Sequence, residues 1–275
     1  MIIDTHTHVV SSDKTKHPLD PGAGGWSLEV SNDVEDLMME MDNAGVEFAT
    51  LVQPNGTYAL DNTYQCDSAK KYYPRTVSVG ILDPAASDAA DKLSYWVNEH
   101  DMKGIRLQSQ ADHDDPICDL LWERAETLSI PISLGGGGTP KKVNQMRNIA
   151  ARHPNVIFAP DHFAGWSGSD DKSGMTTALE GLAKLSNAHL RVSSTSLGPY
   201  EELDSAGKDL FRRVIEAFTP RRVMWGSNFP SSRDGGYIGQ VQLGQTALPW
   251  LSDADRVWIM GETAHKLWPM LAVIK

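Results

Sequence analysis

Cysteine, long apolar runs and net positive charge are all scarce in this 275-residue sequence. Only Cys66 and Cys118 are present and they form no CxxC pair, so their spacing suggests neither a disulfide framework nor a thiolate zinc site. No apolar run approaches the roughly 18 residues that a membrane helix needs. The N-terminus also lacks the basic and apolar segments of a signal peptide. We therefore expect a cytoplasmic protein that has no membrane partner.

Basic residues are outnumbered, with 25 Lys and Arg against 36 Asp and Glu and a net charge of −11. Such a chain repels phosphate backbones unless basic side chains gather on one face, and we find no such cluster. Nucleic acid is therefore not an expected partner. Hydrophobic residues make up 40% and charged residues 22%, which is typical of a globular enzyme-sized domain. The composition does not predict an oligomeric state.

Short apolar or β-branched runs alternate with longer amphipathic stretches, the pattern of parallel strands joined by helices. Eight strands are predicted, at residues 2–5, 48–53, 76–82, 104–107, 130–134, 156–160, 190–193 and 222–225. Helices are predicted at residues 34–44, 62–73, 85–99, 117–128, 140–152, 178–185 and 206–218. Eight such units in about 250 residues are typical of a (β/α)8 TIM barrel, although a doubly wound sheet gives a similar alternation. No linker rich in Pro, Gly or Ser divides the chain, so we predict an α/β fold with one domain over residues 1–275.

Helix ends and the chain terminus give further local signals. Asp33, Asp61 and Thr139 precede predicted helices and are expected N-caps. Residues 253–274 are predicted to form additional helices that close over the barrel.

The first predicted strand runs into Asp4-Thr5-His6-Thr7-His8. Because strand side chains alternate between two faces, Asp4, His6 and His8 are expected to point the same way. Residues at the carboxyl ends of barrel strands are disproportionately catalytic, so this position favours a functional site over two structural histidines. Neutral imidazole can ligate a metal ion, and protonated imidazole can donate a hydrogen bond to a carbonyl.

Three other predicted strands bring polar residues to the same end. His162 follows the sixth strand, Asn228 follows the eighth, and Arg106 lies in the fourth with its side chain predicted to face the lumen. A cation inside a barrel is costly unless it is paired, so Arg106 is expected to face a substrate anion or a carboxylate such as Asp4. A structural Arg–Asp pair is the alternative interpretation.

The loops after the second and eighth predicted strands are polar, and they suggest a substrate-binding rim. The candidate binding residues there, besides Arg106, are Gln53, Asn55, Tyr58 and Arg233. Two guanidinium groups suit one carboxylate, since their forked donors match its planar shape. We expect a small-molecule substrate that carries a carboxylate.

Seven motifs occur in order along nearly the whole chain: DTHTH, VQPNGTY with LDNTY, VSVGILDP, KGIRL, APDH, MWGSNFP and IMGETAHKLW. Together they resemble the amidohydrolase-related family, of the amidohydrolase 2 type. The pattern is most similar to the branch that contains 2-pyrone-4,6-dicarboxylate lactonase and other sugar and muconolactone lactonases. The resemblance implies a distorted (β/α)8 barrel that hydrolyses lactones or amides, with His6, His8, His162 and position 228 around the reacting carbonyl.

The sequence departs from this family pattern at two places. Position 228 is usually an aspartate that serves as the base, and Asn228 cannot accept a proton from water. Residues 131–138, at the fifth predicted strand, offer no metal ligand, so a two-metal centre is not expected.

Two mechanisms remain open. In the first, His6, His8 and His162 hold one divalent ion, zinc or manganese, which lowers the pKa of bound water to roughly 7. In the second no metal is bound, and the histidines with Arg106 polarise the carbonyl while Asp4 accepts the proton of water. Asp161 is not expected in that role, because alternation turns it away if His162 points inward.

A lactonase is the predicted function, and two alternatives are kept. One is a metal-dependent non-oxidative decarboxylase of the same superfamily. The other is a non-catalytic ligand-binding barrel, which the missing base makes worth testing.

Overall fold

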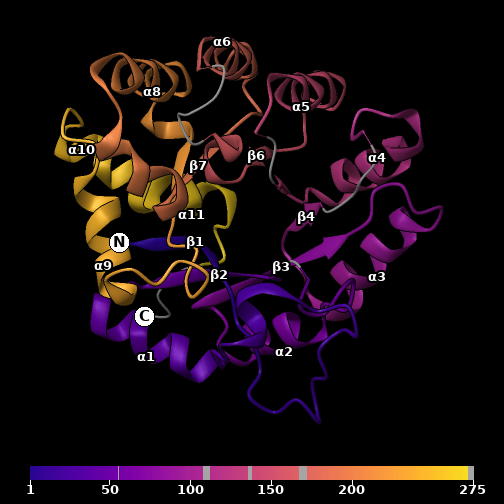
Figure 1. The fold of residues 1–275 in the computed structure, drawn as a ribbon. Helices are drawn as coiled ribbons and strands as arrows, with labels where there is room; N and C mark the ends of the chain where they lie inside the picture. The colour runs from indigo at the N-terminus through magenta and orange to yellow at the C-terminus, as the bar shows by residue number, and fades with distance from the viewer. Residues whose placement is uncertain (55, 108–111, 136–137, 167–171, 272–275) are drawn as a thin grey trace.

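All eight strands of the computed structural model are parallel and curl around a common centre, with helices outside them (Figure 1). The structure describes residues 1–54, 56–107, 112–135, 138–166 and 172–271. The strands are β1 Ile3–Thr7, β2 Phe48–Val52, β3 Thr76–Leu82, β4 Ile105–Leu107, β5 Ile132–Leu134, β6 Phe158–Pro160, β7 Leu190–Ser193 and β8 Val223–Gly226. Strands β1 to β6 form one sheet in chain order, and β7 pairs with β8 in a second.

Single bridges join the two sheets on both sides. Thr7 at the end of β1 bridges Phe229 after β8, and Phe158 in β6 bridges Ala188 before β7. The prediction of an α/β fold with parallel strands is confirmed, and the curled arrangement is TIM-barrel-like. The barrel is distorted at two seams, one between β1 and β8 and one between β6 and β7. At each seam a single bridge takes the place of a full ladder of hydrogen bonds.

Helices follow the strands and cover the outside of the sheet. They are α1 Val34–Ala44, α2 Thr63–Lys71, α3 Ala89–His100, α4 Asp119–Leu128, α5 Pro140–Arg152, α6 Lys172–Ala183, α7 Ser194–Leu197, α8 Ser205–Phe218, α9 Gly236–Thr246, α10 Asp253–Val257 and α11 Thr263–Leu267. Short 3-10 turns lie at Gly25–Leu28, Pro116–Cys118, His162–Gly165, Gly198–Glu202 and Pro220–Arg222, and a π-helical turn at Trp258–Glu262. None of the helices in the described ranges is long and apolar enough to cross a membrane.

Local signals account for most helix starts. Asp33 caps α1 in a capping box, and the Thr139 hydroxyl accepts the backbone N–H of Lys142 at the start of α5. Asp61 is one residue early, because Asn62 occupies the N-cap of α2 while Asp61 accepts the N–H of Thr63 at 2.9 Å.

Helix α9 is absent from the sequence prediction. It contains several glycines, which disfavour helix formation and hide its periodicity. One of them is required by packing, since a Cβ on Gly244 would collide with the indole of Trp225. Packing against Trp225 therefore requires glycine at position 244, and this glycine weakens the helical pattern in the sequence.

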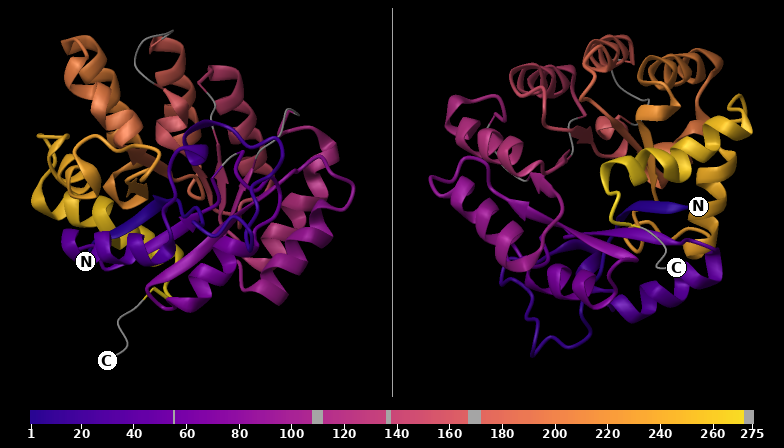
Figure 2. Two further views of the ribbon diagram at one scale, coloured as in Figure 1. Left: turned by 60° about the horizontal axis from the view of Figure 1, so that its bottom comes forward. Right: turned by 180° about the vertical axis from the view of Figure 1, so that it is seen from behind.

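The C-terminal helices close one end of the barrel. A buried apolar cluster joins Ile3, Phe48 and Val77, near the starts of their strands, to Ala264 and Trp268 in the tail. Figure 2 shows this C-terminal segment, in yellow, beside β1. The predicted helical tail thus packs at the amino-terminal end of the strands and not at their carboxyl-terminal end.

Candidate active site

An irregularity in β1 decides which of its side chains face the lumen. The register between β1 and β2 shifts between Asp4 and Thr7, so simple alternation fails there. Asp4 is turned toward β8 and α9, where its carboxylate accepts the N–H groups of His6 at 3.0 Å and Ser227 at 2.9 Å. The Tyr237 hydroxyl also donates to it at 3.0 Å. Contrary to the sequence expectation, the Asp4 carboxylate therefore does not project alongside the imidazoles.

The structure brings the three expected histidines together. The ring centroid of His6 lies 4.9 Å from that of His8 and 4.6 Å from that of His162. Nδ1 of His8 lies 2.8 Å from the carbonyl oxygen of Val52, and Nδ1 of His162 lies 2.7 Å from the Ser193 hydroxyl. Both ring nitrogens of His6 are buried and have no hydrogen-bond partner in the described part of the chain. Among the three histidines, His6 is therefore the one whose two ring nitrogens both lack a hydrogen-bond partner among the described residues.

Burial sets the charge of these rings. Desolvation lowers the pKa of His8 to about 4 and that of His162 to about 3. Desolvation also lowers the pKa of His6 well below its usual value, against the opposing charge of Asp161. All three imidazoles are therefore neutral near pH 7, with lone pairs available for a metal ion or a proton.

A buried ion-pair cluster lies beside them. Asp161 accepts from Nε of Arg106 at 2.9 Å and from Nη1 of Arg191, and it lies 3.6 Å from Nδ1 of His6. Burial alone raises the pKa of Asp161, but the guanidinium of Arg191, with His6 and Arg106, holds it well below its usual range. The expected partner of Arg106 was a substrate anion or a carboxylate such as Asp4, with a structural Arg–Asp pair as the alternative. The structure pairs Arg106 with a carboxylate, that of Asp161.

The backbone after β6 explains why both Asp161 and His162 face inward. His162, Phe163 and Ala164 have φ values of 52°, 58° and 57°, all in the left-handed region. The chain therefore turns sharply directly after the strand, and the alternation that was expected to turn Asp161 away no longer applies. The expectation that excluded Asp161 from the lumen is wrong for this reason.

Asn228 lies where β8 meets the end of β1. Its backbone N–H donates to the carbonyl of His6 at 2.8 Å, and its φ is 62°. One end of its carboxamide lies 3.3 Å from Nε2 of His8. The other end lies 3.2 Å from the Thr195 hydroxyl and 3.0 Å from the Ser232 hydroxyl.

The predicted rim residues mainly connect loops. Gln53 donates to the carbonyl of Ala59, and the Tyr58 hydroxyl accepts the N–H of Ser11. Arg233 is half-exposed, with Nη2 lying 3.9 Å from Glu29. Asn55 lies outside the described residues.

Sequence reasoning gave too little weight to Asp161 and Arg191. Arg191 is fully buried in β7, and its guanidinium also contacts the hydroxyls of Thr5 and Ser133 at 2.9 Å each. The sequence did contain a signal for Arg191, because it lies between Leu190 and Val192 in an apolar strand, where a buried charge requires a partner. Trp26, whose ring centroid lies 5.6 Å from that of His8, adds an aromatic wall on the loop after β1.

The donor set fits one divalent metal ion. Ligand atoms of His6, Asp161 and His162 lie within 4.8 Å of one another, and both nitrogens of His6 lack other partners among the described residues. Nitrogen and carboxylate donors together suit zinc or manganese. His8, the third ligand expected from sequence, is not in this group.

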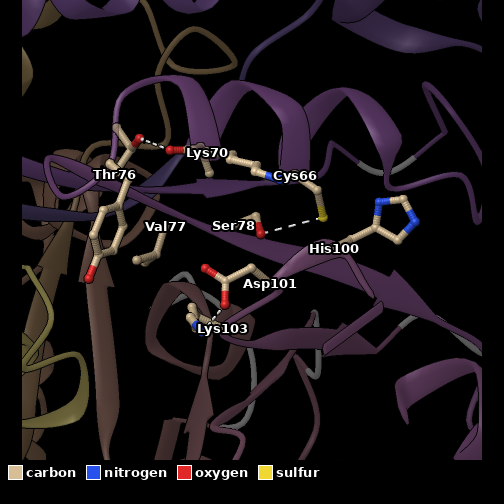
Figure 3. A pocket seen from close by; sticks show the side chains of 10 residues that line it. Cys66, Lys70, Thr76, Val77, Ser78, His100, Asp101 and Lys103 are labelled. Carbon is tan, nitrogen blue, oxygen red and sulfur yellow. Dashed lines mark hydrogen bonds and ion pairs between the residues drawn. The ribbon is translucent and has the colours of Figure 1, made fainter. Parts of the chain in front are cut away.

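A small pocket lies at the opposite end of the barrel from the histidines, and Figure 3 shows the side chains that line it. Its volume is about 10 Å³, enough for a single water molecule. Thr76 opens β3 and Lys103 precedes β4, so this is the amino-terminal end of the strands. The Cys66 thiol lies 3.5 Å from the Ser78 hydroxyl there. Its position and size indicate packing rather than a reaction site.

The parallel barrel, with imidazoles and a buried ion-pair cluster where its strands end, has the form of a hydrolase site of the amidohydrolase class. The amidohydrolase family model matches residues 3–270, so the chain belongs to that family. It is therefore an enzyme of the hydrolase class.

Individual relatives agree with this assignment. The chain is 29% identical over 212 residues to L-fucono-1,5-lactonase of Burkholderia ambifaria, covering 74% of this chain and 72% of that protein. A Pseudomonas putida protein described as a 2-pyrone-4,6-dicarboxylic acid hydrolase has a similar fold, with a TM-score of 0.74, 17% identity, and coverage of 99% of this chain and 98% of that one. A zinc-bound amidohydrolase of Burkholderia multivorans gives a TM-score of 0.75, with 19% identity and coverage of 98% and 99%.

Proposed function

We propose that this enzyme is a lactonase that opens the ring of a small carboxylated lactone by attack of water on the ring carbonyl. The observation that carries the proposal is the convergence of three neutral imidazoles beside the Arg106–Asp161–Arg191 cluster at the open end of the barrel. Membership of the amidohydrolase family and the lactonase relative support the same reaction. The seam between β1 and β8 also supports residues 1–275 acting as one domain, because the first and last strands build the same site.

The residues supply three functions in this proposal. Arg106, at the edge of the cluster, and Arg233, on the rim, attract the carboxylate of the substrate. His6 and His162 contact the reacting carbonyl and water, and one of them accepts the proton that water loses as its oxygen bonds to the carbonyl carbon. The ring carbon–oxygen bond then breaks, and the proton returns to the leaving oxygen to give a hydroxy acid.

His6 is the stronger candidate for the proton acceptor. A buried imidazolium is unfavourable by itself, but Nδ1 of His6 lies 3.6 Å from the Asp161 carboxylate, which would stabilise the positive charge as it forms. Asp4, the base considered from sequence, already accepts three hydrogen bonds. Asn228 is an amide and cannot serve.

We further propose that His6, His162 and Asp161 are the ligands of one zinc or manganese ion in the metal-bound form, in which His6 no longer serves as the proton acceptor. In that position the ion would polarise the carbonyl and lower the pKa of bound water. Metal content per chain, measured on tag-free protein before and after chelation, tests this part. We expect about one ion per chain and loss of activity on chelation. Full activity of the metal-free protein would contradict the proposed metal site and would mean that the histidines catalyse the reaction without a metal.

The reaction itself is tested with a panel of lactones. Proton release is followed for L-fucono-1,5-lactone, other sugar lactones and 2-pyrone-4,6-dicarboxylate, against spontaneous hydrolysis and against the His162→Ala variant. Hydrolysis of at least one lactone that depends on His162 is expected. Carbon dioxide release from aromatic carboxylic acids without lactone opening would replace the proposal by a decarboxylase, and ligand binding without turnover would replace it by a binding protein.

A further inference from the structure

The turn that follows β6 has an unusual backbone. The φ values of His162, Phe163, Ala164 and Gly165 are 52°, 58°, 57° and 73°, so four consecutive residues lie in the left-handed region. L-residues visit this region as single residues, because their Cβ then crowds the following carbonyl oxygen. Every other non-glycine residue of the described ranges with such a φ has no non-glycine neighbour in the same conformation. The three non-glycine residues of this turn therefore hold a conformation that their own backbones disfavour.

Local chemistry does not compensate this strain. Neither Phe163 nor Ala164 has a polar side chain that could bond to its own backbone, as asparagine and aspartate do in this region. The N–H of Trp166 donates to the carbonyl of Phe163 at 3.1 Å, and the N–H of Gly138 donates to the carbonyl of Ala164 at 2.7 Å. These two bonds close the turn and tie it to the segment after β5. A strained backbone persists only where its surroundings hold it, so packing around the turn must favour this conformation.

An aromatic stack supplies that packing. The ring of Phe163 lies parallel to that of Phe211 in α8, with centroids 4.0 Å apart and planes 11° apart. Trp166 stacks on Phe163 at 5.4 Å and on Phe211 at 6.1 Å, and all three side chains are buried. Helix α8 lies outside the barrel (Figure 1). A change of φ at Phe163 redirects its Cα–Cβ bond and would take its ring out of this stack.

We propose that Phe211 is a positioning residue for the active site. Through Phe163 it holds the left-handed turn, and the turn aims Asp161 and His162 into the lumen. A relaxed turn would withdraw both side chains from the site, including the Asp161 carboxylate that accepts from Arg106 at 2.9 Å. The proposal rests on the active site proposed above, and it adds a side chain on an outer helix on which the geometry of that site depends.

The first test is amide hydrogen exchange, measured by NMR at a temperature where local opening and not global unfolding governs exchange. Phe211→Leu removes the stacked ring, and the N–H groups of Gly138 and Trp166 should then exchange faster. Phe211→Met, which keeps more of the side-chain volume, is the second variant should Phe211→Leu not fold. Phe218→Leu is the matched control, because Phe218 is equally buried in α8 but lies under the guanidinium of Arg222, 5.6 Å from its ring centroid. Equal acceleration in Phe211→Leu and Phe218→Leu would overturn the proposal.

A rescue variant separates this role from ordinary core packing. Ala164→Gly lowers the backbone cost of the turn, because glycine adopts a positive φ readily. Added to Phe211→Leu, it should restore much of the lost protection at Gly138 and Trp166, although it cannot refill the space that the phenyl ring occupied. Packing of α8 alone would leave the double variant as poorly protected as Phe211→Leu, and that result would contradict the proposal.

Steady-state kinetics complete the test. Phe211→Leu should lower kcat on the order of ten- to a hundredfold, since small displacements of reacting groups are costly. KM should change less, because Arg233, which attracts the substrate in our proposal, lies on a different loop. Phe218→Leu should keep its kcat, and Ala164→Gly should raise the kcat of Phe211→Leu. Unchanged exchange and kcat in Phe211→Leu would overturn the positioning role and leave the lactonase proposal intact. A lactone panel that is negative for the wild type would remove the lactonase proposal, and the exchange measurements would still decide the role of Phe211.

Discussion

The three imidazoles of the site differ in what their nitrogens contact, and that difference decides what each can do. Nδ1 of His162 lies 2.7 Å from the Ser193 hydroxyl, whereas neither ring nitrogen of His6 has a hydrogen-bond partner among the described residues. Identical residue types thus take different roles, because their hydrogen-bond partners come from different strands.

His162 should be required for turnover. Replacement by alanine removes an imidazole from the reacting carbonyl, and we expect lactone hydrolysis to fall by a factor on the order of a hundred or more. The free energy of unfolding should change by less than about 1 kcal/mol, since the side chain is not part of the apolar core. Steady-state kinetics and urea unfolding check both. His100→Ala, at the opposite end of the barrel, is the control and should retain activity; equal losses in both variants would refute the site assignment.

The two thiols should be unreactive in the folded protein. Cys66 and Cys118 are free and buried, and burial raises the pKa of each to about 11. The reactive thiolate is therefore scarce below pH 11, in contrast to an exposed cysteine with a pKa near 8.5. Labelling with a thiol-specific chromogenic reagent at pH 8 should be slow in buffer and fast for two thiols per chain in denaturant. Fast labelling of one thiol in native protein would contradict this account.

At the scale of single elements, hydrogen bonds at the ends of helices and strands stabilise the framework that carries the site. The guanidinium of Arg222, just before β8, donates to carbonyls at the ends of two helices. Its partners are Ala183 at the end of α6, Leu185 and Ala188 in the connection from α6 to β7, and Ala217 in the last turn of α8. One side chain therefore ties together the carboxyl ends of neighbouring helices and the strand that follows.

Arg222→Ala should destabilise the fold. It would leave several partly buried carbonyls without donors, and we expect the free energy of unfolding to fall by about 2–3 kcal/mol. Arg221→Ala is a matched control, because the Arg221 guanidinium lies over the ring of Trp258, 4.1 Å from its centroid. Its loss should cost about 1 kcal/mol or less. Denaturant unfolding of both variants measures the difference. Equal effects would show that the carbonyl contacts of Arg222 do not stabilise the protein.

At the scale of the whole molecule, the site exists because the first and last strands meet. Glycine is required at this seam. A Cβ on Gly226 would lie 2.6 Å from Cβ of His6 and 2.9 Å from its backbone nitrogen, far closer than such atoms approach. The close approach of β8 to β1 places Asn228 beside His8 and brings His6 toward the cluster around Asp161.

Gly226→Ala should therefore affect stability and catalysis together. The added methyl forces β1 and β8 apart, which should cost about 1–3 kcal/mol of unfolding free energy and displace His6. Turnover should fall even at temperatures where the variant is fully folded. Gly198→Ala is the control, since nothing lies within 4 Å of a Cβ there and its φ of −57° is helical. A fully active, stable Gly226→Ala protein would show that the seam tolerates separation.

Patterns of local sequence predicted much of this architecture. Helices α1 and α5 and strands β3 and β7 have the predicted bounds, because amphipathic periodicity, N-caps and β-branched runs act over a few residues. The same logic located His6, His8, His162 and Asn228 at strand ends. Elements whose residues are selected by distant contacts, such as the glycine-containing α9, did not show this local pattern.

The sequence by itself determined the order of strands and helices, the family and the set of side chains available at the open end of the barrel. Only the tertiary structure decided how those side chains pair. The irregular register of β1 turned Asp4 into the wall, and the left-handed turn after β6 turned Asp161 toward His6, Arg106 and Arg191. The physical reason is that alternation is a local property of a regular strand. The partner of a buried charge is set by strands far apart in sequence that meet when the barrel closes.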